Sequence, residues 1–319
     1  MSGAVAIPAR LLPLLALLLL SVLLLFSTLG GNRIGNGTHD IEKRSADLLN
    51  ATMSPTAAAD RGLPAEPEIL AQSYLVEIIG DQAPLLARRV SKQMRPASLT
   101  KILTSFIAIE ELDPNAPVVF SPFAKAAGEK ESPVPAGEAF IRNDAIRFAV
   151  VESANDAAVA LAEAVGRKRG AFSFDDAISL FVQAANQKAK QLGMTNSRFE
   201  NPTGLDNDDH YTTAEDLFRL VSNVWENHPE IWEFSRANEA DIRSVGGTSY
   251  HIAATNQLLN EFPGLRGGKT GLTDLAKGAL ILLYPVKPDR TGVIIILGSD
   301  NRFDDGRKLI HWLDSAFNF

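Results

Sequence analysis

Strand-like segments stand at both ends of the folded part of this chain, and they limit its fold more than any other feature. Tyr74–Ile79 and Leu85–Val90 are apolar runs separated by Gly80-Asp81. Ala279–Tyr284 and Thr291–Leu297 have the same character near the end of the chain. Because the sequence between the two pairs is helical in pattern, the chain has to return to one sheet after a helical section. The sequence therefore predicts an α+β domain in which a helical lobe is inserted into a sheet.

The helical section carries apolar residues at the spacing of one helix face. Its first helix is expected to end at Asp113-Pro114, because proline cannot continue a helix. Thr212-Thr213-Ala214-Glu215 matches a capping box, which opens a helix. The expected helices are Leu99–Leu112, Ala145–Val151, Ala157–Val165, Phe174–Leu192, Thr212–Val224 and a last amphipathic segment, Leu309–Phe317.

The N-terminus is the most apolar part of the chain. From Leu11 to Asn32 there are 22 uncharged residues, most of them leucine. About 20 apolar residues span a bilayer as a helix, whereas the apolar part of a signal peptide has roughly 7–15 residues and ends at small residues. The segment ends Phe26-Ser27-Thr28-Leu29-Gly30 without such a site, which favours an uncleaved anchor through residues 11–29. A cleaved signal peptide is the alternative.

The chain is predicted to have three parts. Residues 1–32 are the membrane anchor or signal peptide. Residues 33–68 are rich in glycine, proline and alanine with mixed charges, which is typical of a flexible linker. Residues 69–319 are long enough for one large domain.

Composition excludes several classes of function. The net charge is −7, so no basic surface favours nucleic acid, and no nucleic-acid partner is expected. The chain has no cysteine, which excludes disulfides, thiolate catalysis and cysteine-bound zinc. Its five histidines do not cluster, and neither HExxH nor GxSxG occurs.

The first catalytic candidate is Ser98-Leu99-Thr100-Lys101, at the start of a predicted helix. Residues three apart share a helix face, so the Lys101 amine can reach the Ser98 hydroxyl. A serine hydroxyl needs a base to become a nucleophile, and a lysine can serve if burial lowers its pKa. Helix-start N–H groups favour negative charge beside the serine. A capping serine with a solvated lysine gives the same four residues, so this motif is weak by itself.

The second candidate, Ser153-Ala154-Asn155, lies between two predicted helices. Its serine could pass a proton to a leaving amine, and its asparagine could hold Lys101 or a substrate carbonyl. Ser299-Asp300-Asn301 also fits S-x-N but follows the third motif, so we expect it to form a turn after the last strand.

The third candidate is Lys269-Thr270-Gly271, preceded by two glycines. A strand edge flanked by glycine lets a substrate backbone come close, and a lysine with a threonine hydroxyl can bind a carboxylate. The order S-x-x-K, S-x-N, K-T-G is shared by β-lactamases and penicillin-binding proteins, and the three together are far more specific than any one.

With these motifs the chain resembles the low-molecular-mass penicillin-binding proteins, the serine D-Ala-D-Ala carboxypeptidases of the peptidase S11 type. Pro96–Lys101 resembles the nucleophile segment of that family, and Ser153–Ala158 resembles its second element. Phe199–Leu205 resembles the stretch that follows its helical lobe. The likeness runs from about Tyr74 to Phe319.

The resemblance implies a β-lactamase or penicillin-binding-protein transpeptidase-like fold, with an antiparallel sheet flanked by helices and an inserted all-helical lobe. It implies that Ser98 attacks a peptidoglycan stem peptide ending in D-Ala-D-Ala and forms an acyl-enzyme that water hydrolyses. Lys101 would be the base, and Ser153 and Asn155 would assist proton transfer and positioning.

The resemblance also implies how the substrate is held. Lys269, Thr270 and Gly271, with Arg302, would bind the terminal carboxylate side. Backbone N–H groups of Ser98 and Leu272 would form the oxyanion hole. No metal or organic cofactor is implied, and β-lactams would be covalent inhibitors. A substrate of this kind places the catalytic domain on the extracytoplasmic side of the cell membrane, behind a single span.

Three departures from the family pattern stand out. Ala276-Lys277-Gly278 replaces the usual Ala-Gly after K-T-G, which leaves the register of the next strand open. Ala185-Asn186 replaces a Met-Asn pair, which is expected to affect packing only. Many relatives attach to the membrane through a C-terminal amphipathic helix, whereas here the N-terminal span is expected to do so.

Related activities remain as alternatives. A class A β-lactamase needs a glutamate in an E-x-x-N arrangement, and none occurs between Asn155 and Lys269. A β-lactam-sensing domain would need an output segment, and only about ten residues precede the span. An endopeptidase or transpeptidase acting on cross-links uses the same acyl-enzyme and stays open.

Overall fold

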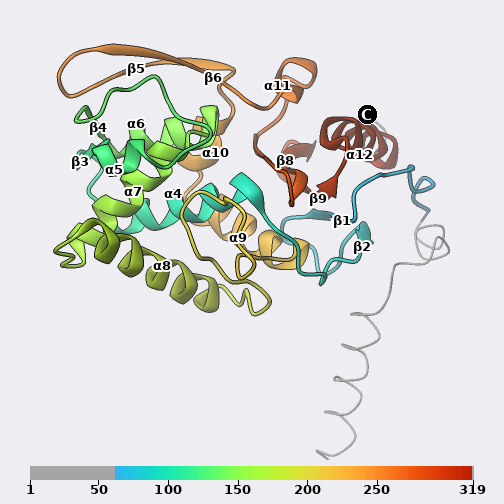
Figure 1. Ribbon diagram of the computed structural model, residues 1–319. Helices are drawn as coiled ribbons and strands as arrows, with labels where there is room; N and C mark the ends of the chain where they lie inside the picture. The colour runs from blue at the N-terminus through green and yellow to red at the C-terminus, as the bar shows by residue number, and fades with distance from the viewer. Residues whose placement is uncertain (1–61, 318–319) are drawn as a thin grey trace, which may run out of the picture. The chain divides into compact units, whose positions relative to one another are not determined.

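A five-stranded antiparallel sheet forms one layer of the molecule. The computed structural model describes residues 62–317, and within them the strands follow the order β2-β1-β9-β8-β7 (Figure 1). The first pair and the last three strands meet in this sheet because β1 pairs with β9 along its whole length. The strands are β1 (Ser73–Ile78), β2 (Leu86–Arg88), β7 (Gly267–Thr273), β8 (Lys277–Lys287) and β9 (Arg290–Ser299).

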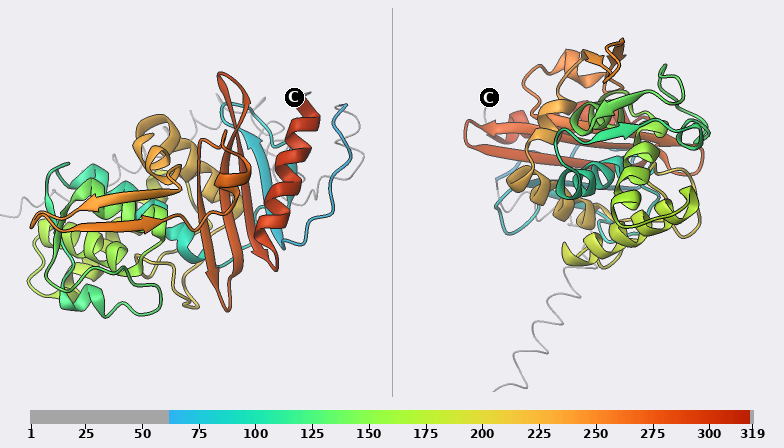
Figure 2. Two further views of the ribbon diagram at one scale, coloured as in Figure 1. Left: turned by 90° about the horizontal axis from the view of Figure 1, so that it is seen from above. Right: turned by 90° about the vertical axis from the view of Figure 1, so that its left-hand side faces the viewer.

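Both faces of the sheet are buried, so its central strands are apolar at nearly every position. Along β9, Val293 and Ile295 join one hydrophobic core while Ile294 and Ile296 join another, as the two-residue period of a strand requires. The second core is covered by α12 (Arg302–Phe317), which lies along one face of the sheet (Figure 2).

The opposite face carries the helical lobe (Figure 2). Its centre is α4 (Thr100–Glu111), a helix in which ten of twelve residues are buried. Such a helix can only form inside a shell of other helices, which explains why it lacks a polar face. The shell consists of α6 (Arg142–Arg147), the π-helix η2 (Phe148–Glu152), α7 (Asn155–Lys168), α8 (Phe174–Gln191), α9 (Ala214–Asn227) and α10 (Glu230–Ser235).

Short elements complete the lobe and the connections. The lobe is mainly helical, and it also holds two antiparallel ribbons, which the expectation of an all-helical lobe left out. These ribbons are β3 (Pro117–Val119) with β4 (Ala139–Ile141), and β5 (Glu239–Arg243) with β6 (Ser249–Ala253). The remaining elements are the 3₁₀-helix η1 (Ala97–Leu99), α5 (Pro122–Lys125) and α11 (Leu258–Glu261).

The predicted α+β architecture is confirmed, and two local expectations are refined. The cap of α9 is Thr213, whose side chain accepts from the Asp216 N–H, one residue later than the predicted capping box. After K-T-G, Thr273 pairs with Lys277 and Leu272 with Gly278. Lys277 takes a left-handed φ of 60°, so it occupies the turn position that glycine usually fills.

The predicted membrane segment, residues 11–29, and most of the predicted linker lie outside the described residues. Among residues 62–317 no helix is both long and apolar enough to cross a bilayer. The last linker residues contact the domain: the Trp312 indole donates to the Pro64 carbonyl, and Arg88 pairs with Glu66.

Candidate active site

The site begins at the turn that leads into α4. Ala97 has a left-handed φ of 48°, an unusual conformation for a residue with a side chain. This turn and the 3₁₀ geometry of η1 set Ser98 one turn before Lys101. Lys101 Nζ lies 2.8 Å from Ser98 Oγ. The spacing predicted from the sequence is therefore realised at the start of the buried helix.

Lys101 has two further partners, and together they define its role. Its Nζ lies 2.7 Å from Asn155 Oδ1 and 3.0 Å from the Thr203 carbonyl oxygen. Asn155 Nδ2 donates to the Gly128 carbonyl, which orients the amide so that its oxygen faces Lys101. The Asn155 amide oxygen and the Thr203 carbonyl oxygen can only accept hydrogen bonds. A neutral amine has two N–H groups and one lone pair. With both N–H groups directed at these acceptors, the lone pair faces the Ser98 hydroxyl.

The surroundings favour this neutral form. Lys101 is fully buried, and loss of hydration lowers its pKa to about 7, with the charge of Lys130 as the next cause. An amine with a pKa near neutrality is a good general base at physiological pH.

Ser153 and Asn155 flank the start of α7. Ser153 ends the π-helix η2 in a left-handed conformation, with φ of 66°. Such a break turns the chain sharply and lets both side chains face inward. Asn155 reaches Lys101, one of the two options that the sequence left open. Ser153 instead accepts a hydrogen bond of 2.7 Å from the Lys269 ammonium.

Strand β7, at the edge of the sheet, forms the other wall. Lys269 also donates to the Thr270 carbonyl, and the Thr270 hydroxyl lies 2.6 Å from that of Thr255. A Cβ added to Gly271 would lie 3.1 Å from the Ser98 backbone nitrogen and 2.9 Å from Ala97 Cβ. Glycine is therefore required where β7 meets the nucleophile turn. The next residue, Leu272, is 61% exposed, at the open edge.

Positive charge gathers on this side of the site. The pKa of Lys269 lies well below its ordinary value, first because the group is buried and then because Lys101, Lys130 and Arg302 repel its charge. Arg302 begins α12, and its Nε is buried without a hydrogen-bond partner among the described residues. Lys269, Lys130 and Arg302, with the unused donor of Arg302, form a good site for an anionic group.

Several residues of the site were not found from sequence. Lys130 belongs to the loop between α5 and β4, and its carbonyl accepts from the Asn155 backbone N–H at 2.7 Å. Asp156 is buried and accepts from Lys125 Nζ and from the Ser132 hydroxyl, so it fixes that loop against α7. The sequence signal that could have indicated this loop is Asp156, directly after Asn155. A carboxylate buried beside the second motif needs hydrogen-bond donors, here Lys125 and Ser132.

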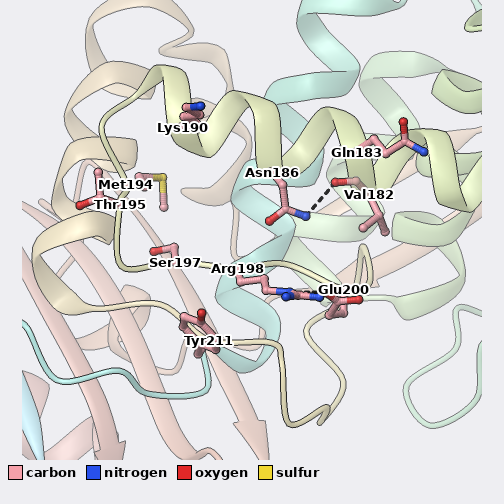
Figure 3. A pocket seen from close by; sticks show the side chains of 10 residues that line it. All are labelled: Val182, Gln183, Asn186, Lys190, Met194, Thr195, Ser197, Arg198, Glu200 and Tyr211. Carbon is pink, nitrogen blue, oxygen red and sulfur yellow. Dashed lines mark hydrogen bonds and ion pairs between the residues drawn. The ribbon is translucent and has the colours of Figure 1, made fainter.

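A groove of about 820 Å³ lies elsewhere, between α8 and residues 194–200 (Figure 3). None of the candidate catalytic residues lines it. Among the residues described, no group of three or more histidine or acidic side chains is arranged to hold a metal ion.

Comparisons with known proteins agree with this geometry. The model of peptidase family S11, D-alanyl-D-alanine carboxypeptidase, matches residues 61–299. The carboxypeptidase DacF of Bacillus subtilis is 28% identical over 239 residues, which cover 73% of this chain and 59% of that protein. The chain thus spans about three fifths of that relative. A D-alanyl-D-alanine endopeptidase of Pseudomonas aeruginosa is 27% identical over 279 residues, covering 85% of this chain and 84% of that one.

Solved structures share the fold. A D-alanyl-D-alanine carboxypeptidase from Mycobacterium tuberculosis matches with a TM-score of 0.68 and 26% identity, over 79% of this chain and 93% of that chain. The Streptomyces K15 DD-transpeptidase matches with a TM-score of 0.72 and 22% identity, over 78% of this chain and 99% of that one. The sheet, the lobe and the family match lead to one conclusion: the chain belongs to peptidase family S11, the D-alanyl-D-alanine carboxypeptidases.

Proposed function

We propose that this protein is a serine D-Ala-D-Ala carboxypeptidase that removes the terminal D-Ala from peptidoglycan stem peptides. The observation that carries the proposal is the environment of Lys101. Two obligate acceptors, on Asn155 and Thr203, leave its lone pair for the Ser98 hydroxyl. A lysine held in this way can activate a serine without a histidine.

The reaction follows from this arrangement. As Ser98 Oγ attacks the carbonyl carbon of the penultimate D-Ala, its proton moves to Lys101 Nζ. The N–H groups of Ser98 and Leu272 stabilise the oxyanion. Cleavage of the C–N bond releases D-Ala, whose nitrogen receives, through the Ser153 hydroxyl, the proton that Lys101 took from Ser98, so that Lys101 is neutral again. Water then hydrolyses the ester on Ser98, with Lys101 as the base, and releases the shortened peptide.

The cations on the β7 side supply the substrate specificity. A D-Ala-D-Ala terminus carries a carboxylate, and Lys269, Thr270 and Arg302 present donors to it. The unpartnered Nε of Arg302 supports this role, because a buried donor without a partner costs free energy until a ligand binds it. β-Lactams carry a carboxylate and a strained amide, so they would acylate Ser98 as well.

The experiment uses the full chain in detergent or in membranes with a pentapeptide ending in D-Ala-D-Ala. The expected result is release of free D-Ala, which is abolished in Ser98→Ala, and a penicillin adduct on Ser98. If the wild-type protein yields neither D-Ala nor an adduct, the proposal is wrong.

An endopeptidase is the second candidate. The Pseudomonas relative named as an endopeptidase is matched over 84% of its length, against 59% for the Bacillus carboxypeptidase. Digestion of purified cross-linked dimers separates the two. Faster cleavage of dimers than of pentapeptides would favour the endopeptidase.

Membrane attachment through residues 11–29 is also part of the proposal, with the catalytic domain on the extracytoplasmic side. It is supported by the leucine-rich span and by a substrate outside the membrane. Protease treatment of spheroplasts or protoplasts, in which the outer face of the cytoplasmic membrane is accessible, tests it. The protease should release the catalytic domain from the outer face of the membrane. A domain that is protected, or that is not attached to the membrane, would contradict the proposal.

A further inference from the structure

His210 is a buried histidine with no role in the reaction described above. It is 1% exposed and lies directly behind the nucleophile turn, between that turn and the segment that carries Thr203. Its ring meets the Phe199 ring edge-on, with centroids 5.4 Å apart. A polar side chain buried to this extent is expected to have both ring nitrogens paired.

The hydrogen bonds of His210 define one tautomer. The backbone N–H of Glu200 donates to Nδ1 at 3.2 Å, so this nitrogen carries no proton. Nε2 lies 2.9 Å from Thr100 Oγ1. The single hydroxyl proton of Thr100 is directed at the Ala97 carbonyl, 2.9 Å away, so Nε2 has to be the donor. The result is a directed chain from Glu200 through His210 and Thr100 to Ala97.

One end of this chain holds the nucleophile turn. Ala97 directly precedes Ser98 and has the left-handed φ of 48°. Gly204 lies directly against the Ala97 carbonyl: a Cβ added to Gly204 would come within 1.7 Å of that oxygen. A strained residue keeps its conformation only when its surroundings restrain it. Thr100 and Gly204 supply that restraint next to the reacting hydroxyl.

The other end holds the acceptor for the base. Glu200 lies three residues before Thr203, whose carbonyl oxygen accepts a hydrogen bond from the Lys101 amine. Asn201 Oδ1 accepts from the backbone N–H groups of Thr203 and Gly204, so the short turn moves as a unit. The bond from Glu200 to His210 holds this turn relative to the nucleophile, together with the Thr104 hydroxyl, which donates to the Pro202 carbonyl at 2.7 Å.

The segment that carries Thr203 is unevenly enclosed: Phe199 and residues 202–204 are buried, whereas Arg198 is exposed. Arg198, Glu200 and Tyr211 line the open groove beside α8, so one side of the segment faces solvent (Figure 3). On its inner side hydrogen bonds add restraint, with His210 as the rigid spacer between the Glu200 backbone N–H and the Thr100 hydroxyl.

We propose that His210, as the neutral Nε2–H tautomer, is a positioning residue that fixes the Thr203 carbonyl relative to Ser98 and so aims the lone pair of Lys101. This role rests on the proposed function. A mutation outside the reacting groups that displaces a catalytic side chain by about 1 Å can reduce the rate by about 100-fold. Its effect should appear in kcat rather than in KM.

The test compares His210→Leu with His210→Gln in the full chain. Leucine removes both hydrogen bonds, whereas the glutamine amide keeps a donor near the position of Nε2. The readouts are the rate of Ser98 acylation by a fluorescent penicillin, and kcat and KM for the pentapeptide. His210→Leu should lower acylation and kcat by about 10- to 100-fold with KM within about threefold, and His210→Gln should recover most of the loss.

Leu309→Ala is the matched control, because it opens a cavity in the core on the other face of the sheet. It should lower the melting temperature and leave acylation within about threefold. Thr100→Val breaks the same chain at its other end. Its loss should not add to that of His210→Leu, and this comparison serves if His210→Leu fails to fold.

Acylation by His210→Leu within about threefold of the wild type, or a loss no greater than that of Leu309→Ala, would overturn the positioning role. So would Thr100→Val acylating at the wild-type rate. These results require an active wild-type protein. A wild-type chain that does not acylate refutes the proposed function instead.

Discussion

Two buried lysines, one from the helical lobe and one from the edge of the sheet, face the same site with opposite tasks. Lys101 and Lys269 are both buried, and both pKa values are lowered first by desolvation. Their partners differ. Lys101 meets two obligate acceptors and the Ser98 hydroxyl, whereas Lys269 donates to Ser153 and to the Thr270 carbonyl and lies beside Arg302. The partners, and not burial, decide which lysine is the base and which binds the anion.

The largest expected effect comes from removing the base. Lys101→Met should lower Ser98 acylation by about 10²- to 10⁴-fold, because within residues 62–317 Lys101 is the group that contacts the Ser98 hydroxyl and can take its proton. The loss should be equal for a peptide acid and for its C-terminal amide. Acylation kinetics with penicillin and both peptides check this, and an acylation rate close to that of the wild type would remove Lys101 from the mechanism.

Removing the anion-binding lysine should have a smaller and more selective effect. Lys269→Met is expected to lower kcat/KM for the peptide acid by about 10- to 100-fold, the cost of one hydrogen bond to a charged group. With the C-terminal amide the difference from wild type should shrink, since the carboxylate is absent. Equal losses on both peptides would mean that the two lysines do not divide the work as proposed.

The pH dependence sharpens the comparison further. Lys101 acts as a neutral amine with a pKa of about 7, so acylation should rise with pH through that value. Lys130 lowers this pKa by its charge. Lys130→Gln should therefore raise the pKa of Lys101 and move the acid limb of kcat/KM to higher pH.

The control for this shift is Lys287→Gln, at the far end of β8, which should leave the profile unchanged. A profile of Lys130→Gln that overlays that of the wild type would show that the charge of Lys130 does not reach the base.

The smallest expected effect is on the stability of the folded protein at acidic pH, and it comes from His210 on the lobe side of the site. Burial lowers the pKa of His210 to about 4, and Asp206 is the charged group that opposes this shift. Between pH 6.5 and about 4 the unfolded chain therefore binds a proton that the folded chain does not, and stability falls as the pH falls through this window. His210→Gln should flatten this part of the melting-temperature profile.

His311→Gln, at an exposed position on α12, is the matched control and should keep the wild-type dependence. If His210→Gln loses stability with acid as steeply as the wild type, other groups are responsible for the acid sensitivity.

The sequence by itself determined the elements and the order of the chemistry. Short, nearly continuous apolar runs placed β1, β8 and β9, and the helical spacing of the middle section placed α4, α7 and α8, because these patterns depend only on neighbours along the chain. The pairing of Ser98 with Lys101 was also local, since three residues on a helix start are one turn. The family resemblance, confirmed by the match to residues 61–299, joined the three motifs into one site.

Only the tertiary structure decided how the site is tuned. Lys101 and the Thr203 carbonyl are 102 residues apart in sequence, and Thr100 and His210 are 110 apart, so no local pattern pairs them. The lowered pKa of Lys101 arises from burial by the whole lobe and from the charge of Lys130. Desolvation and charge–charge interaction depend on distance in space. A sequence can therefore name a serine and its lysine, but their reactivity is set by the packing around them.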